Sequence, residues 1–173
     1  MGRLTFIVGG ARSGKSTYAL GLAEKSKNVA FIATCAYAAS DPEMVRRIEL
    51  HKKERPSHWE TFEGSKNIAS LLNEIGSRFD VVLVDCLTLF ISGMLVGTVE
   101  EGVIENQAQE MIHAVKKIKA GVIVVSNEVG LGVVPEYPLG RQFRDLSGRI
   151  NQLMARAADE VFFMVSGLPL QIK

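Results

Sequence analysis

The stretch LTFIVGGARSGKSTYAL, residues 4–20, decides the fold of this 173-residue chain. The apolar run over 4–8 is typical of a strand buried on both faces, and residues 9–16 fit the phosphate-binding pattern G-x-x-x-x-G-K-[ST]. Glycine lets backbone N–H groups approach phosphate oxygens, and the helix that follows presents its N-terminus to the anion. The stretch therefore predicts a strand, a phosphate-binding loop (P-loop) and a helix.

The same alternation of strand and helix signals continues along the chain. Apolar runs predict strands at 29–33, 81–84, 122–125 and 161–165, and 59–63 fits a short extra strand. Helical periodicity predicts helices over 16–27, 41–55, 68–75 and 143–157, and another that opens with the capping pattern of Thr98 and Glu101 ahead of 104–118. This order predicts an α/β fold of the P-loop NTPase class, with a mostly parallel sheet flanked by helices. Residues 1–173 are expected to form a single nucleotide-binding catalytic domain.

Composition excludes several classes of protein. Apolar residues make up 47% of the chain and charged residues 23%, with a net charge of +1, so nothing points to binding of nucleic acid or an anionic membrane. No apolar run is long enough to span a bilayer. The two cysteines, Cys35 and Cys86, have no metal-ligand spacing and are interpreted as reduced and buried, which favours a cytoplasmic protein.

Two side chains of the P-loop have defined chemical roles. Lys15 is expected to reach the β and γ phosphates of a nucleotide, and Ser16 to bind Mg²⁺. Arg12 either contacts a phosphate or faces solvent. Asp85 directly follows four apolar residues, which is the position of a Walker-B acid that helps to hold magnesium, although a turn-capping role is the alternative.

Other signals narrow the class of nucleotide-binding protein. Ser126, Asn127 and Glu128 follow another strand, so they should lie on the same rim of the sheet. Glu128 either binds a ligand or caps a loop. The chain lacks N-K-x-D, which argues against switch GTPases, and it lacks H-R-D and D-F-G, which excludes protein kinases.

A basic stretch, RIELHKKERPSHW at 47–59, contains His51 and His58. A neutral imidazole at His51 is chemically able to attack phosphorus, and nearby cations would stabilise the developing negative charge. The residues alone favour the alternative, a solvated basic helix that happens to carry a histidine. His58 is expected in a turn, and His113 on a helix surface.

Several blocks together resemble one enzyme family. They are GGARSGKS, the IAT after the second strand, RIxxHKxxRPxHWxTxE, and the C-terminal run from NEVGLG to Lys173. In this combination the chain is similar to the bifunctional adenosylcobinamide kinase / adenosylcobinamide-phosphate guanylyltransferase family of cobalamin biosynthesis. One departure is Leu50, where some relatives have a second histidine.

The resemblance implies two reactions and a set of residues for them. ATP or GTP would phosphorylate adenosylcobinamide, and GTP would then donate GMP to His51 and onward to the corrinoid phosphate. The implied fold is RecA-like, the implied assembly a homotrimer, and the substrates a corrinoid and nucleotides. The implied nucleotide contacts are Gly9, Gly10, Ala11, Arg12, Ser13, Gly14, Lys15, Ser16, Thr34, Cys35, Ala36, Lys52, Lys53, Glu54, Arg55, Glu63 and Asp85.

Two other functions remain open at this level. A P-loop kinase of a small hydroxylated metabolite would explain the P-loop and Asp85 but would leave the histidine block without a role. A nucleotide-dependent switch or binding module would show no turnover with a corrinoid. Position alone makes 86–98 and 130–142 candidates for the corrinoid site, since both follow strands, although the apolar 86–98 equally suits contact with another subunit.

Overall fold

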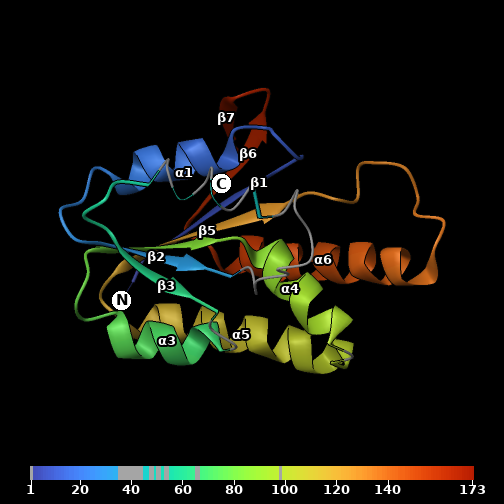
Figure 1. Cartoon of the computed structure of the whole chain (residues 1–173), viewed down its shortest axis with the longest axis horizontal. Coiled ribbons are helices and arrows are strands. Elements are labelled where there is room, and N and C mark those ends of the chain that lie inside the picture. Colours follow the sequence, from blue (N-terminus) through green and yellow to red (C-terminus); the bar gives the residue numbers. More distant parts are fainter. Residues whose placement is uncertain are drawn as a thin grey trace.

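The computed structural model describes residues 2–34, 45–46, 49, 52, 55–64, 67–97 and 99–173. Element labels follow Figure 1. The strands are β1 Leu4–Gly9, β2 Val29–Ala33, β3 Glu60–Glu63, β4 Val81–Asp85, β5 Gly121–Asn127, β6 Glu160–Val165 and β7 Leu168–Gln171. The helices are α1 Lys15–Ala23, α3 Ile68–Ile75, α4 Leu87–Val96, α5 Glu101–Lys117 and α6 Pro138–Ala157.

The strands form one sheet in the order β3-β2-β4-β5-β1-β6-β7. All neighbours pair in parallel except β6 and β7, which pair antiparallel. The prediction of a mostly parallel sheet is confirmed, including the short strand at 59–63, which is observed as β3. The strand that carries the P-loop, β1, lies inside the sheet between β5 and β6.

Helices cover both faces of the sheet (Figure 1). Alternate residues of the strands point to opposite faces, and each face has its own apolar cluster. Phe6 and Val84 join the cluster that includes α3, α4, α5 and α6, whereas Ile7 and Leu83 join the cluster formed with α1. Burial on both faces explains why these strands appear in the sequence as continuous apolar runs.

Some helix boundaries and one strand differ from the prediction. Helix α5 has Glu100 as its N-cap, without a side-chain cap bond, whereas the sequence pattern placed the cap at Thr98, which lies outside the described residues. Helix α6 begins at Pro138 rather than near 143, because proline suits the first turn of a helix. Residues 87–96, a candidate loop for a corrinoid, are the helix α4, whose apolar residues are mostly buried in the core. Strand β7 was not predicted.

The register of the sheet brings the expected site residues to one edge. Ala33 of β2 is level with Glu63 of β3 and with Asp85 of β4, and Gly9 of β1 is level with Asn127 of β5. In parallel sheets this carboxyl edge is where ligands bind. Within the residues that the structure describes, no helix is long and apolar enough to cross a membrane.

Candidate active site

The P-loop joins β1 to α1 and depends on glycine at two tight points. Gly14 is the N-cap of α1 and has a left-handed backbone, with φ at 88°, which favours glycine because other residues place their Cβ too close to the backbone there. A Cβ on Gly14 would lie 3.1 Å from the Cα of Gly167, and one on Gly9 would lie 2.6 Å from the carbonyl oxygen of Met164. The loop is therefore packed tightly against the β6–β7 turn.

Lys15 begins α1 with its side chain buried at the mouth of the loop. Its Nζ donates a hydrogen bond of 2.6 Å to the carbonyl oxygen of Gly10. Burial lowers the pKa of the ammonium from its ordinary value, and Cys86 and Asp85 act in the opposite direction. A buried cation with one carbonyl partner gains from an arriving anion, which replaces the lost hydration. Lys15 thus suits the phosphate-binding role predicted for it.

The end of β4 meets the end of β2 beside this lysine. The N–H of Thr34 donates to the carbonyl oxygen of Asp85 at 3.2 Å, and its hydroxyl donates to the carbonyl oxygen of Cys86 at 2.6 Å. Thr34 is buried, so these two bonds hold the loop after β2 against the loop after β4. The structure therefore places Thr34 and Asp85, two predicted site residues, side by side.

A group of charged residues lies on the far side of Asp85. Lys52 forms an ion pair of 2.7 Å with Glu63, at the end of β3. Both side chains are about half exposed, so the pair contributes little to stability and mainly fixes position. Arg55 is more deeply placed: burial lowers the pKa of its guanidinium, while Asp85 and Glu63 act to raise it. Lys52, Arg55 and Glu63 thus extend the predicted site beyond Asp85.

Orphaned polar atoms coincide with this region. Four buried side-chain atoms among the described residues lack a hydrogen-bond partner: Ser13 Oγ, Arg55 Nε, Trp59 Nε1 and Ser147 Oγ. Two of them, those of Ser13 and Arg55, belong to residues expected to bind a nucleotide. Because an unpaired buried polar atom costs about 1–3 kcal/mol, the unpaired Nε of Arg55 favours a polar ligand beside this residue.

The remaining predicted residues are exposed, buried or outside the described part of the chain. Ala11 and Arg12 are exposed in the loop, so Arg12 faces solvent while remaining beside the anion-binding backbone. His51, Cys35, Ala36, Lys53 and Glu54 lie outside the described residues. His58 is exposed in a turn, His113 is exposed on α5, and Cys86 is free and buried, as predicted.

A buried hydrogen-bond network under the rim was not anticipated. Ser126 Oγ donates to Asn151 Oδ1 at 2.7 Å and lies 3.2 Å from Thr88 Oγ1. The N–H of Asn127 donates to Thr88 Oγ1 at 2.6 Å, and Asn151 Nδ2 donates to the carbonyl oxygen of Asn127 at 3.1 Å. Side chains from α4 and α6 therefore hold both backbone groups of Asn127, the last residue of β5. Glu128 accepts from the N–H of Gly130 at 2.7 Å, which is the loop-capping alternative.

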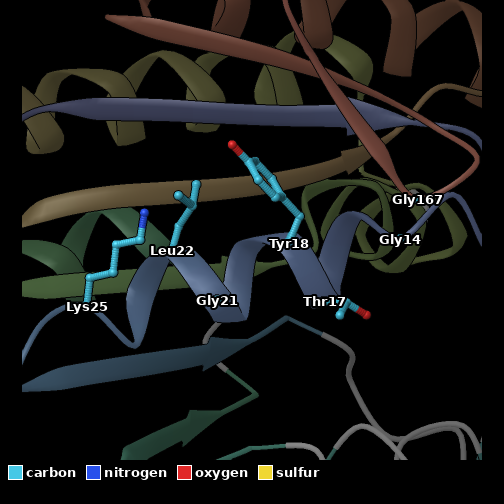
Figure 2. Close-up of a pocket in the computed structure, with 7 residues that line it drawn as sticks. All are labelled: Gly14, Thr17, Tyr18, Gly21, Leu22, Lys25 and Gly167. Atoms are coloured by element: carbon cyan, nitrogen blue, oxygen red, sulfur yellow. The ribbon is translucent and has the colours of Figure 1, made fainter.

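An open groove of about 570 Å³ runs along α1 from the P-loop (Figure 2). Gly14 and Gly21 lack side chains, so backbone forms its floor. Thr17 lies on one side, and Figure 2 shows Tyr18, Leu22 and Lys25 projecting together on the other. Gly167 of the β6–β7 turn closes the end nearest the P-loop.

The donor set at the rim suits magnesium. Ser16 supplies a hydroxyl on the first turn of α1 and Asp85 a carboxylate at the end of β4. Mg²⁺ prefers oxygen ligands and usually takes only one or two from protein, with water and phosphate oxygens completing the shell. Groups of three or more His, Cys, Asp or Glu able to hold a metal do not occur in the part of the chain that is described. Ser16 and Asp85 therefore fit a cation that arrives with a nucleotide.

Comparisons with known proteins show the family of this chain. The family model of cobinamide kinase / cobinamide phosphate guanyltransferase matches residues 5–172. The chain belongs to this family. It is 38% identical to the bifunctional adenosylcobalamin biosynthesis protein CobU of Salmonella typhimurium, covering 98% of this chain and 99% of that protein. It is 39% identical to the corresponding protein CobP of Pseudomonas aeruginosa, covering 96% and 95%.

As a member of the cobinamide kinase / guanyltransferase family, the chain is an enzyme of a family with two activities. A solved structure supports the fold independently of sequence. The KaiC-like protein of Pyrococcus horikoshii superposes with a TM-score of 0.55 at 13% identity, covering 93% of this chain and 70% of that one. At this identity the likeness concerns the fold alone, and it confirms the predicted RecA-like P-loop class.

Proposed function

We propose that this chain phosphorylates adenosylcobinamide with ATP or GTP and then transfers GMP from GTP to adenosylcobinamide phosphate. The observation that carries the proposal is the convergence of two sets of residues at one sheet edge. One is the P-loop with Lys15 and Asp85, and the other is the Lys52, Arg55 and Glu63 group beyond it. The full-length family match supports the same conclusion.

In the kinase step, the terminal hydroxyl oxygen of the corrinoid attacks the γ-phosphorus. The bond from that phosphorus to the β,γ-bridging oxygen breaks, the nucleoside diphosphate leaves, and the hydroxyl proton passes to solvent. Lys15 and the loop N–H groups neutralise charge on the phosphates as the bond breaks. Mg²⁺, held by Ser16 and Asp85, would supply further charge neutralisation.

In the transfer step, a ring nitrogen of His51 attacks the α-phosphorus of GTP. A P–N bond forms, the bond to the α,β-bridging oxygen breaks, and pyrophosphate leaves. A phosphate oxygen of the corrinoid phosphate then attacks the same phosphorus and the P–N bond breaks, which gives adenosylcobinamide-GDP and restores the histidine. Two displacements replace one difficult step. Lys52 and Arg55 are proposed to stabilise the transferring phosphoryl charge.

Intact-mass spectrometry after mixing the protein with GTP and Mg²⁺ tests the transfer step. We expect one added GMP on the unsubstituted protein, labile in acid and stable in base, and none on His51→Ala. A kinase without nucleotidyl transfer would phosphorylate a small hydroxylated substrate and would never gain this mass. Lys15→Ala should lose both reactions, since the P-loop holds phosphate groups of both leaving groups, the nucleoside diphosphate and pyrophosphate.

We propose that residues 1–173 act as one catalytic domain, that the enzyme is a homotrimer, and that it works in the cytoplasm, where ATP and GTP are supplied. Light scattering on the purified protein tests the trimer, with a monomer mass as the contrary result.

A further inference from the structure

We infer that the groove along α1 holds the nucleoside of the phosphate donor in the kinase step, and that the guanylyl donor places its nucleoside on the opposite side of the P-loop. This inference rests on the proposed function. It assigns a purine-nucleoside site to Thr17, Tyr18, Gly21, Leu22 and Lys25, none of which the sequence had suggested as a binding residue.

A triphosphate bound in the P-loop for phosphoryl transfer has a defined direction. Lys15 reaches the β and γ phosphates in such loops, and the Walker-B acid lies near the metal that bridges them. Here Lys15 interacts with Asp85, and β4 lies beyond β5 from β1 in the sheet. For phosphoryl transfer, the γ end therefore faces the β4 side, and the nucleoside end points toward β6 and β7.

The groove begins where that nucleoside end would emerge. It shares Gly14 with the P-loop and is bounded by Gly167, whose N–H donates to the carbonyl oxygen of Ser13 at 3.0 Å. Its volume of about 570 Å³ lies within the range of small-ligand sites, which is about 300–1,000 Å³. The groove is thus continuous with the phosphate site and large enough for a nucleoside.

The lining has the chemistry to hold a purine. Tyr18 offers a ring face, and its position is set by an edge contact with Phe162, with ring centroids 5.3 Å apart. Leu22 adds apolar surface, and Thr17 contributes a hydroxyl to the other side of the groove. The described residues that line it include no carboxylate or carboxamide to read a base edge. A groove of this kind would accept adenine and guanine alike.

The two reactions place opposite demands on the bound triphosphate. Phosphoryl transfer exposes the terminal phosphorus to the acceptor, whereas guanylyl transfer brings the innermost phosphorus to His51. Lys52, the sequence neighbour of His51, pairs with Glu63 at the end of β3, beyond Asp85 from the P-loop. For the innermost phosphorus to reach that side, the nucleoside must lie there too. A single P-loop therefore binds the triphosphate in two opposite directions.

A bulky residue in the groove floor should block the nucleotide orientation used for phosphoryl transfer and leave the orientation used for guanylyl transfer free. We choose Gly21→Leu, because a Cβ at Gly21 meets nothing within 4 Å and the side chain would fill the groove without disturbing α1. Gly102→Leu on α5 is the matched control, since Gly102 is also helical and its Cβ is also in open space. Both substitutions replace glycine by a better helix former, so their effects on helix stability should be similar.

Three measurements are made on each variant: binding of a fluorescent ATP analogue with Mg²⁺, the KM for ATP in the kinase reaction, and the rate of GMP attachment to His51. In Gly21→Leu we expect the Kd for the ATP analogue and the KM for ATP in the kinase reaction to rise by about tenfold or more relative to Gly102→Leu. The rate of GMP attachment should fall by much less, so the ratio of the two activities shifts.

Two results would overturn the inference: an ATP affinity in Gly21→Leu equal to that of Gly102→Leu, or equal weakening of both reactions. Failure of the proposed function is recognised separately, because the unsubstituted protein would then form no corrinoid phosphate and gain no GMP.

Discussion

Arg55 stacks on Phe31, with the guanidinium carbon 3.7 Å from the centre of the ring. Phe31 is a buried residue of β2, next to the strand that ends at Asp85. The contact supports one face of the guanidinium, while the Nε of Arg55 has no hydrogen-bond partner among the residues that the structure describes. An arginine fixed by a ring and lacking a partner for a buried donor is prepared to bind phosphate.

This arrangement predicts that Arg55→Ala lowers the rate of GMP attachment to His51 by about a hundredfold, the usual effect of removing a donor that stabilises transition-state charge. The rate for Arg55→Lys should lie between those of the unsubstituted protein and Arg55→Ala, because lysine keeps the charge but not the planar contact with Phe31. The measurement is the rate of mass gain with GTP.

Arg78 provides the control for Arg55. Its guanidinium carbon lies 5.1 Å from the centre of the Phe79 ring, but the side chain is exposed and bonded to Glu60. Arg78→Ala should leave the rate of GMP attachment at the unsubstituted value. A similar loss in both variants would mean that Arg55 acts only through general charge or stability.

The P-loop glycines predict a difference in stability. Gly14→Ala should lower the free energy of unfolding by about 1–3 kcal/mol, because Gly14 has a φ of 88° and its Cβ would press on Gly167. Gly10→Ala should stay within about 0.5 kcal/mol, since a Cβ there meets nothing within 4 Å. Urea unfolding of both variants tests this, and equal values would contradict the close packing of the loop.

Much of the fold could be predicted because its strands are buried on both faces. Such strands leave apolar runs, and the P-loop pattern fixes where the first helix begins. Strand β7 was missed because all four of its residues are exposed and one is Pro169, features typical of an edge strand that lacks an apolar pattern. The first turn of α6 was missed because Leu139 there is exposed, so core-facing periodicity starts later.

The site could be predicted only in part, for a different reason. Lys15 and Asp85 follow from local patterns, each set by the strand that precedes it. The stacking of Arg55 on Phe31 and the bond from Ser126 to Asn151 join residues distant in sequence. No local spacing specifies such pairs, and the family resemblance named Arg55 without showing what supports it.

The buried thiol predicts a pH dependence of stability. Burial raises the pKa of Cys86 from 9.0 to about 12. Between these values the unfolded chain loses the proton while the folded chain keeps it, so stability falls as pH rises through this window. The effect should not exceed about 1.4 kcal/mol per pH unit.

Urea unfolding between pH 8 and pH 10.5 checks this, with Cys86→Ala as the comparison. Other groups titrate in the same range, so the informative quantity is the difference between the two proteins. We expect the stability of the unsubstituted protein to fall more steeply above pH 9. Parallel curves would show that the thiol is ionised as easily in the folded protein as in the unfolded chain.

The network beneath the rim predicts coupling between Ser126 and Asn151. Ser126→Ala removes the shared hydroxyl and leaves the acceptor of Asn151 buried without its partner, at a cost of about 1–3 kcal/mol. Adding Asn151→Ala should cost less than the sum of the single changes, with a coupling energy of about 0.5–3 kcal/mol. Ser147→Ala is the control, because this serine is fully buried on α6 and its hydroxyl has no partner within the described part of the chain. Its removal should not lower the free energy of unfolding, since no bond is lost. If Ser147→Ala and Ser126→Ala cost the same, loss of packing and not the hydrogen bonds would explain the effect, and Asn127 would not be held in the way described.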